Sequence, residues 1–513
     1  MEDEALSESR LLAHLRRVPW WASLPLGGLA LALAFPSFNL IPLAWAGLLP
    51  LLDFLIRRPS WKRTAAGHLL FAVPFLGLLL YWIPNVLVTF GGFPRAGALG
   101  AFLALLLLLS LLMAPFTLLT RWCAGRSASL ALFCAPGFWM LNELWRNYFV
   151  AGGFPWGLLG YTQVPVPWLP MAADIGGVFL ISFLLVALNA ALLAWMRGRP
   201  RLLPPLTAGL LAAALLYGAY RTHLGIPAAG SSLTAALVQP DVGLAENREH
   251  YARKYFETLP AFYIEALQRG ADWFIVSEAQ NPFFFGRDFY YTTFWQRQVR
   301  NYGMPMLFNS THIDPQRPGV YYNSAHLLGP DGEAAYRYDK MKLVPFGEYV
   351  PWAGVMKYFF SPLVQEVGSF TPGSQMTVGQ VDSLTFSTLI CFEGIFPQVS
   401  RQAARQGAQV LVNITNDSWY GESSAPYQLL QMARMRSIET QRPMLRSANT
   451  GLTVLIDAQG RIEDRIEPFR QGLLVTEVEG ALGLSAYARM GEWLNIGIVA
   501  LTLAAALFWK PKE

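Results

Sequence analysis

Long apolar runs fill the first part of the chain. Seven of them are each close to the roughly 20 residues that a helix needs to cross a bilayer, and an eighth lies at the end of the chain. The runs cover about 18–35, 39–56, 68–90, 97–120, 128–146, 170–196, 203–221 and 491–509. The pattern predicts a seven-helix membrane domain over 1–222 and a C-terminal membrane helix within 489–513.

The pattern of apolar positions changes between the seventh and the eighth run. Short β-type strings, among them "LTAALVQP", "DWFIVSEA" and "AQVLVNITN", alternate there with polar helical stretches. Strands separated by helices favour an α/β domain, and a segment of about 260 residues is long enough to bury its own core. We therefore expect a separate domain over 225–485.

The composition supports a membrane protein. Hydrophobic residues make up 53% of the 513 residues and charged residues only 14%, whereas soluble domains carry about 25% charged residues. Arginines follow the second, fourth and sixth runs, for example Arg57, Arg121 and Arg197. Basic loops stay in the cytoplasm, so the domain over 225–485 is expected on the outer side of the membrane. The net charge of +5 is better explained by these loops and lipid head groups than by nucleic acid.

Three predicted strands end on a reactive side chain. Glu278 follows "DWFIVS", Lys340 lies in "YRYDKMKLVPFGEYVP", and Cys391 lies in "STLICFEGIF". A thiol attacks as the thiolate, a carboxylate can take its proton, and an ammonium group can stabilise both the thiolate and the oxyanion that follows. The three groups together are sufficient for acyl transfer without a histidine.

Each reactive residue also has a structural explanation. A cysteine after a strand is often a core residue, a lysine a solvated charge, and a glutamate a helix cap. Cys123 and Cys134 lie in or beside apolar runs and are interpreted as small hydrophobic residues, and His326 as a structural histidine within a strand. No metal-ligand spacing occurs in the sequence, and no cofactor is expected.

The order Glu, Lys, Cys resembles the nitrilase superfamily. The words "VSEA", "YDKMKLVPFGEYVP", "ICFEGIFP" and "NITNDSWYG", together with eight predicted spans, resemble more narrowly the apolipoprotein N-acyltransferases. The resemblance implies an α/β fold, with a nitrilase-like α-β-β-α sandwich domain on a bundle of eight transmembrane helices.

The resemblance also implies roles for individual residues. Cys391 corresponds to the nucleophile, Glu278 to the general base, and Lys340 to the group that stabilises the thiolate and the oxyanion. Glu348 corresponds to a glutamate that orients the lysine, and Glu393 to a supporting glutamate two residues after the cysteine.

Four further residues are candidates for substrate binding. Trp419 matches the family word, and Phe392 stands where the best-known members have a tyrosine. The apolar stretch 351–365, "PWAGVMKYFFSPLVQ", contains Phe359 and Phe360. It is either a mobile arm that admits acyl chains or an ordinary packed helix. A tryptophan that the family carries after the first strand is absent from "ALVQPDVGLAENREHY".

The function implied by the resemblance is the last step of lipoprotein maturation. An acyl chain passes from a phospholipid, phosphatidylethanolamine, through a cysteine thioester to the N-terminal amine of an S-diacylglyceryl-cysteine apolipoprotein. The partners are the phospholipid donor, the diacylated lipoprotein acceptor and the bacterial inner membrane, with the catalytic domain facing the periplasm.

Other functions fit parts of the sequence. A membrane-anchored amidase or hydrolase of the nitrilase type would use the same three residues with water as the acceptor. A transporter with an outer sensing domain would need charges lining its spans, and few occur. An inactive binding relative would be expected to have lost part of the Glu278, Lys340 and Cys391 set. The roles of Glu143, Arg146 and Asp174, which lie within predicted spans, stay open.

Overall fold

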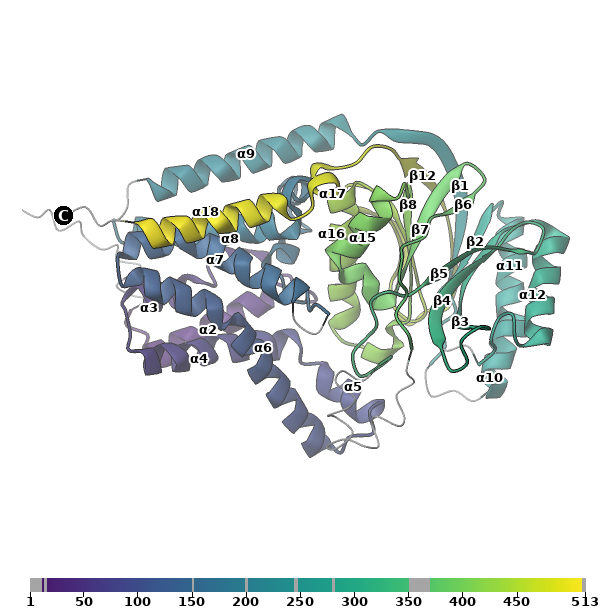
Figure 1. Ribbon diagram of the computed structural model, residues 1–513, viewed down its shortest axis with the longest axis horizontal. Coiled ribbons are helices and arrows are strands. Elements are labelled where there is room, and N and C mark those ends of the chain that lie inside the picture. Colours follow the sequence, from purple (N-terminus) through teal and green to yellow (C-terminus); the bar gives the residue numbers. More distant parts are fainter. Residues whose placement is uncertain are drawn as a thin grey trace, which may run out of the picture. The chain divides into compact units, whose positions relative to one another are not determined.

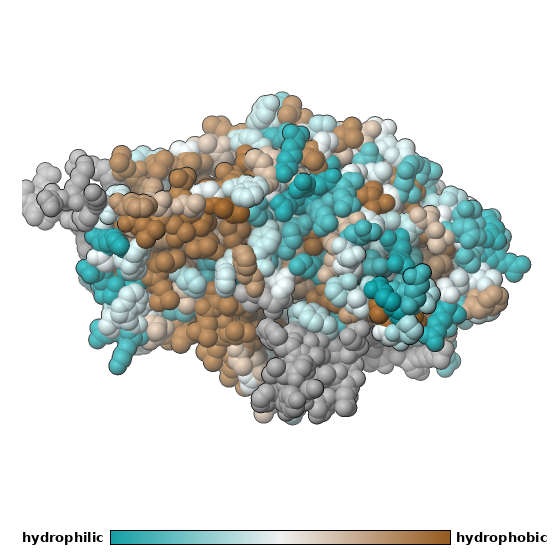
Figure 2. Space-filling model, in the orientation of Figure 1, coloured by the Kyte–Doolittle hydropathy of each residue, from teal (hydrophilic) through white to brown (hydrophobic). Residues whose placement is uncertain are grey.

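The computed structural model describes residues 12, 16–149, 152–198, 202–243, 248–278, 282–349 and 370–509. The chain forms two compact units. The first is helical and comprises Met1–Leu224 together with Met490–Glu513, and the second is an α/β unit over Gly225–Arg489 (Figure 1). Figure 2 shows that hydrophobic side chains gather on the surface of the helical unit, as expected for a surface that meets lipid.

The described part of the helical unit contains α-helices joined by short turns and 3-10 segments. The α-helices are α2 (Trp20–Leu33), α3 (Leu49–Ile56), α4 (Trp61–Leu79), α5 (Ile83–Thr89), α6 (Arg95–Ala124), α7 (Ala128–Tyr148), α8 (Ala173–Met196), α9 (Leu203–Leu224) and α18 (Trp493–Phe508). The 3-10 segments are η1 (Ile41–Trp45), η2 (Leu159–Gln163) and η3 (Leu169–Ala172).

The number of membrane spans differs from the eight expected. Within the described residues, three helices are long and apolar enough to cross a membrane: Arg95–Ala124, Leu169–Met196 and Leu203–Leu224. A fourth span is possible if α4 and α5, which are bent by 54° at their junction, count as one. The other expected spans coincide with α2, with η1 and α3, with α18, and with α7. The first three are shorter apolar helices, and α7 carries buried polar side chains.

The ionisable residues inside the helical unit make structural contacts. Asp174 of α8 accepts hydrogen bonds from the Tyr217 hydroxyl (2.8 Å) and from Arg221 Nε (3.2 Å), both of α9. Glu143 Oε1 accepts from Trp139 Nε1 (2.8 Å) and from the backbone N–H of Leu159 (2.8 Å). These contacts tie α8 to α9, and α7 to the segment that follows it.

The α/β unit contains two six-stranded sheets. The first has the order β12-β1-β2-β3-β4-β5 and the second β11-β10-β9-β8-β7-β6. The strands are β1 (Ala228–Gln239), β2 (Trp273–Val276), β3 (Met306–Ile313), β4 (Tyr321–Leu328), β5 (Ala334–Asp339), β6 (Gly379–Val381), β7 (Leu384–Ile390), β8 (Val410–Thr415), β9 (Met444–Ala448), β10 (Thr453–Ile456), β11 (Ile462–Ile466) and β12 (Gly472–Ala481).

Helices cover the outer face of each sheet (Figure 1). α10 (Arg248–Arg253), α11 (Leu259–Gln268) and α12 (Phe289–Tyr302) pack on the first sheet, with a π-helical turn η4 (Lys254–Thr258) between the first two. α15 (Pro397–Arg405) and α16 (Ala425–Thr440) pack on the second sheet, and α17 (Ala486–Met490) follows β12.

The inner faces of the two sheets pack against each other. The ring of Trp273 in β2 lies 4.7 Å from that of Phe386 in β7, centroid to centroid, and Phe386 also contacts Tyr336 of β5 at 5.0 Å. The order of layers is helix, sheet, sheet, helix, which confirms the predicted α-β-β-α sandwich.

The strand directions explain where functional side chains gather. β1, β2 and β3 run parallel in the first sheet, and β7, β8 and β9 run parallel in the second. The apolar sequence strings predicted β1, β2, β7 and β8, and nearly all residues of these strings are buried in the structure. Residues that follow the carboxyl ends of such strands are held by a rigid scaffold but stand outside the ladder.

Candidate active site

The three predicted reactive residues follow three different strands. Glu278 comes two residues after β2, Lys340 directly after β5, and Cys391 directly after β7 as the first residue of η5 (Cys391–Ile395). Lys340 Nζ lies 3.7 Å from Glu278 Oε1. Cys391 interacts electrostatically with both of these groups. The structure thus brings together two carboxyl-end residues of the first sheet and one of the second.

Lys340 is a buried cation held by carboxylates. Lys340 is 1% exposed, and its Nζ lies 2.8 Å from Glu348 Oε1. The backbone N–H of Val344 donates to the other oxygen of Glu348 (2.8 Å), which fixes that carboxylate. Burial alone would lower the pKa of Lys340, but Glu348, Glu278 and Cys391 together raise it above its ordinary value. The ammonium group is therefore charged throughout the physiological range, as an oxyanion partner must be.

Asn323, in the middle of β4, connects the two carboxylates. Its Nδ2 donates to Glu278 Oε1 (3.0 Å) and to Glu348 Oε1 (2.7 Å). Asn309 of β3 donates to the oxygen of the Asn323 amide (2.7 Å), which fixes its orientation. The second oxygen of Glu278 accepts from the backbone N–H of Asn416 (3.1 Å). Each oxygen of Glu278 therefore has a hydrogen-bond donor, so the carboxylate is held in one position.

Cys391 stands in an unusual backbone conformation and in a buried setting. Its φ is +54°, in the left-handed region, and the residue is 8% exposed. Burial, reinforced by Glu278, raises the pKa of the Cys391 thiol, while Lys340 and a hydrogen bond with Thr415 act to lower it. The net effect favours the protonated thiol at rest. The geometry therefore suits attack coupled to proton transfer to a neighbouring base rather than a preformed thiolate.

Glu393 is a buried carboxylate that connects two segments of the site. Its Oε1 accepts from the Tyr338 hydroxyl (2.7 Å) and from the backbone N–H groups of Met341 (2.7 Å) and Lys342 (3.0 Å). Its Oε2 accepts from the backbone N–H of Ile390 (2.9 Å). One side chain thus holds the segment after Lys340 against the turn that carries Cys391.

The proposed substrate-binding residues divide into two groups. Trp419 lies half-buried in η6 (Asp417–Tyr420), which begins two residues after the end of β8. Phe392 is buried with its ring against Phe396 at 5.1 Å. Both are therefore on segments that border the thiol. Phe359 and Phe360 lie outside the described residues.

Sequence reasoning missed several residues of the site. Asn323 gave no signal, because a single polar residue within a strand is common. Asn416 and Tyr420 were visible in the word "NITNDSWYG" but were not singled out. Tyr420 lies near Cys391, Asp417 and Glu278, and burial together with these neighbours holds its pKa well above the ordinary value.

His326 has the structural role expected for it. The residue is 4% exposed, and its ring packs on Phe308 at 5.7 Å and near Phe285 at 5.3 Å. Burial, with smaller effects from His312 and Arg337, lowers the pKa of His326 to about 3. The imidazole is neutral and does not serve the thiol. In the described ranges no group of three or more His, Cys, Asp or Glu side chains is arranged to hold a metal ion.

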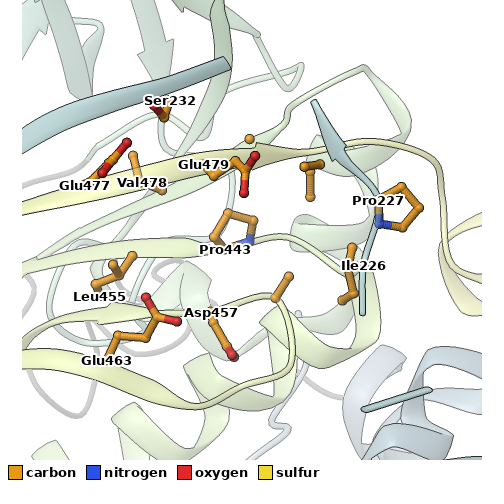
Figure 3. Close-up of a pocket in the computed structure, with 14 residues that line it drawn as sticks. Ile226, Pro227, Ser232, Pro443, Leu455, Asp457, Glu463, Glu477, Val478 and Glu479 are labelled. Atoms are coloured by element: carbon orange, nitrogen blue, oxygen red, sulfur yellow. The ribbon is translucent and has the colours of Figure 1, made fainter. Parts of the chain in front are cut away.

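A surface hollow of about 460 Å³ lies elsewhere in the α/β unit. It is located where β1 begins and where β10 and β12 end, and four carboxylates line it: Asp457, Glu463, Glu477 and Glu479 (Figure 3). This is the opposite end of the strands from Cys391, so the hollow takes no part in the thiol chemistry.

Two family models match the chain. The model of the carbon–nitrogen hydrolases covers residues 234–485, and that of the apolipoprotein N-acyltransferase N-terminal domain covers residues 27–191. Among solved structures, an amidase from Nesterenkonia sp. is 19% identical, with a TM-score of 0.38 over 52% of this chain and 95% of that one.

Curated relatives match along nearly the whole chain. The apolipoprotein N-acyltransferase of Geobacter metallireducens is 36% identical over 504 residues, which is 95% of both chains. Those of Azotobacter vinelandii and Pseudomonas putida are 33% and 32% identical and cover 95% and 94% of this chain. On this similarity the chain belongs to the apolipoprotein N-acyltransferase family and is an acyltransferase with a nitrilase-type catalytic unit.

Proposed function

We propose that this enzyme, a membrane protein of the bacterial inner membrane, transfers an acyl chain from a phospholipid to the N-terminal amine of a diacylated lipoprotein. The transfer passes through a thioester on Cys391. The observation that carries this proposal is the convergence of Glu278, Lys340 and Cys391 from three strand ends onto one buried site. The names of the relatives supply the acceptor class.

The first half-reaction forms the thioester. Cys391 Sγ attacks the ester carbonyl carbon of the phospholipid while Glu278 takes the thiol proton. The carbonyl oxygen becomes an oxyanion that Lys340 Nζ stabilises. The carbon–oxygen ester bond then breaks, and Glu278 returns the proton to the oxygen of the departing lysophospholipid.

The second half-reaction forms the amide. The free α-amine of the lipoprotein's diacylglyceryl-cysteine attacks the thioester carbonyl, and Glu278 takes a proton from the nitrogen. The carbon–sulfur bond breaks, the acyl chain stays on nitrogen as an amide, and the proton returns to Cys391 Sγ. Water must be kept from the thioester, because hydrolysis would turn the transferase into a phospholipase.

Supporting residues hold this machinery in place. Glu348 orients Lys340, and Glu393 fixes the two segments that carry Lys340 and Cys391. Phe392 and Trp419 would contact substrate beside the thiol. Phe359 and Phe360 would form part of an arm that admits acyl chains from the leaflet. Phosphatidylethanolamine is the proposed donor, and the periplasm the proposed location of the catalytic unit.

Intact-protein mass spectrometry with an isotope-labelled phosphatidylethanolamine tests the proposal. The wild-type protein should gain the mass of one acyl chain, and Cys391→Ala should gain none. Cys123→Ala, which changes a cysteine of the helical unit, serves as the matched control and should be acylated like the wild type. An adduct that survives Cys391→Ala would show that another residue carries the acyl group.

The same experiment distinguishes acyl transfer from the alternative hydrolase activity. Supply of phospholipid alone should leave a stable thioester, which a diacylated lipopeptide then discharges as its N-acylated product. Rapid release of free fatty acid without lipopeptide would instead favour water as the acceptor.

A further inference from the structure

A second buried cation lies behind the nucleophile. Arg446, in the middle of β9, is 2% exposed. In the register of the sheet it stands beside Asn413 of β8, which in turn stands beside Leu389 of β7. A buried guanidinium needs charged and hydrogen-bonding partners. Arg446 finds them in Asp417, with Nη2 2.8 Å from Oδ2, and in Asn413, whose Oδ1 accepts from Nη1.

Asn413 links Arg446 to the backbone around Cys391. Because its oxygen is occupied by Arg446, its Nδ2 faces β7 and donates to the carbonyl oxygens of Leu389 (2.8 Å) and Cys391 (3.4 Å). The amide thereby fixes the peptide that follows the strand, at the residue with the left-handed conformation.

Asp417 links Arg446 to the surroundings of the Cys391 thiol through Thr415. Its Oδ1 accepts a hydrogen bond from the Thr415 hydroxyl (2.9 Å), and the same hydroxyl acts on the Cys391 thiol, whose pKa it lowers. A hydroxyl has a single proton to donate. It can give that proton to Asp417 or to the sulfur, but not to both at once.

We propose that Arg446 is a positioning residue for the nucleophile. By holding Asp417 through charge, it allows the Thr415 hydroxyl to turn from Asp417 to Cys391 Sγ when the thiol loses its proton to Glu278. Without Arg446, Asp417 would be a buried carboxylate whose remaining partner is this hydroxyl, and it would retain the proton. The inference rests on the proposed role of Cys391 as nucleophile.

Other charged or titratable groups also face the thiol. They are Glu278 after β2, Lys340 after β5, and Asp417 and Tyr420 in η6. Asp417 on its own disfavours the thiolate, so its neutralisation by Arg446 acts in the same direction as the turn of the hydroxyl. A change at Thr415 alters the hydroxyl while leaving all of these charges in place, which makes it the more selective probe.

The test is the rate at which iodoacetamide alkylates Cys391 in the full-length protein in detergent micelles, without substrate, between pH 6 and pH 9. Peptide mass spectrometry distinguishes alkylation of Cys391 from alkylation of Cys123 and Cys134. Because the rate below the thiol pKa follows the thiolate fraction, one unit of pKa corresponds to a tenfold change in rate. Thr415→Val should slow alkylation about tenfold at each pH, and Thr415→Ser, which restores the hydroxyl, should recover the wild-type rate.

Arg446→Gln completes the experiment as one side of a double-mutant cycle. In the wild-type background it should slow alkylation about tenfold, and in the Thr415→Val background about threefold or less. An equal factor in both backgrounds, or wild-type rates for Thr415→Val, would overturn the inference. If Arg446→Gln does not fold, the Thr415→Val and Thr415→Ser pair still tests the hydroxyl on which the role of Arg446 depends, and wild-type rates in Thr415→Val overturn the inference. The readout needs no acyl donor or acceptor, so a failure of the proposed acyl transfer would leave this result unaffected.

Discussion

The Tyr338 hydroxyl donates a hydrogen bond of 2.7 Å to Glu393 Oε1, and so joins the strand before Lys340 to the turn after Cys391. Backbone N–H groups of Met341, Lys342 and Ile390 complete the set of donors around the same carboxylate. One side chain that hydrogen-bonds to neither the ammonium nor the thiol therefore helps to set the positions of both.

Glu393→Gln should disable the enzyme although it preserves size. A glutamine places its NH2 group against at least one of these donors, and an unsatisfied buried polar group costs about 1–3 kcal/mol. We expect acyl transfer to fall about 100-fold and the melting temperature to drop. Tyr338→Phe is the matched control, because it removes one donor and adds none, and it should cost about 1 kcal/mol. A Glu393→Gln enzyme with the wild-type rate would contradict this role.

Asn323→Asp should shift the pH dependence of the reaction. The new carboxylate would lie beside Glu278 Oε1 and Glu348 Oε1, and a neighbouring like charge raises the pKa of a carboxyl group. The acid limb of the rate profile should move upward by about one pH unit, so that transfer on that limb falls about tenfold at a given pH. Asn323→Ala loses the donors without adding charge, so it should be slow without moving the limb. An unmoved limb in Asn323→Asp would argue against contact between residue 323 and the proposed base, Glu278.

His326 should make the α/β unit less stable in acid. Its pKa of about 3 in the folded chain lies below the ordinary value of 6.5, so the unfolded chain binds the extra proton as the pH falls from 6.5 towards 3. The stability contributed by the neutral imidazole is complete above pH 6.5 and declines below it, by about 2 kcal/mol at pH 5.

His326→Phe, which suits the surrounding rings, should remove this loss. Thermal unfolding of both proteins at pH 7.5 and pH 5.0 measures the difference. The same acid shift in both proteins would show that His326 is not responsible.

Arg221→Leu should destabilise the helical unit. Asp174 would remain as a buried carboxylate with the Tyr217 hydroxyl as its hydrogen-bond partner, and breaking a buried ion pair in this way costs about 3–5 kcal/mol. Asp174→Asn combined with Arg221→Leu should recover part of the loss in thermal unfolding. Acyl transfer per folded molecule should stay near the wild-type value in both variants. No recovery in the double variant would mean that Arg221 acts through packing.

The sequence was most informative where apolar strands run into single reactive residues. Glu278 and Cys391 were recognisable because each follows a string of buried positions, whereas Lys340 follows the half-exposed strand β5 and stood out through the word "YDKMKLVPFGEYVP". The alternation of strands and helices predicted an α/β domain, and the resemblance to the nitrilase superfamily implied the sandwich. β9 escaped notice because "MLRSA" carries Arg446 and Ser447 in its centre, where an apolar residue is expected. Both side chains are buried, and only their partners in other strands explain why.

Hydropathy also overlooked breaks inside apolar runs. The run over 68–90 was expected to form one span, but α4 ends at Leu79 and α5 begins at Ile83 with Pro84 in its first turn. Proline lacks a backbone donor and favours the start of a helix, so the chain bends there without becoming more polar. A scale that counts only apolar character cannot detect such a bend.

The left-handed backbone at Cys391 has a consequence for the evolution of this enzyme. The left-handed conformation costs residues other than glycine about 1–2 kcal/mol. The native cysteine is therefore less stable at this position than glycine would be. Glycine there would relax the chain and abolish the chemistry. Selection for thermal stability alone would therefore favour glycine over cysteine here, and the proposed nucleophilic role of Cys391 accounts for the strained residue.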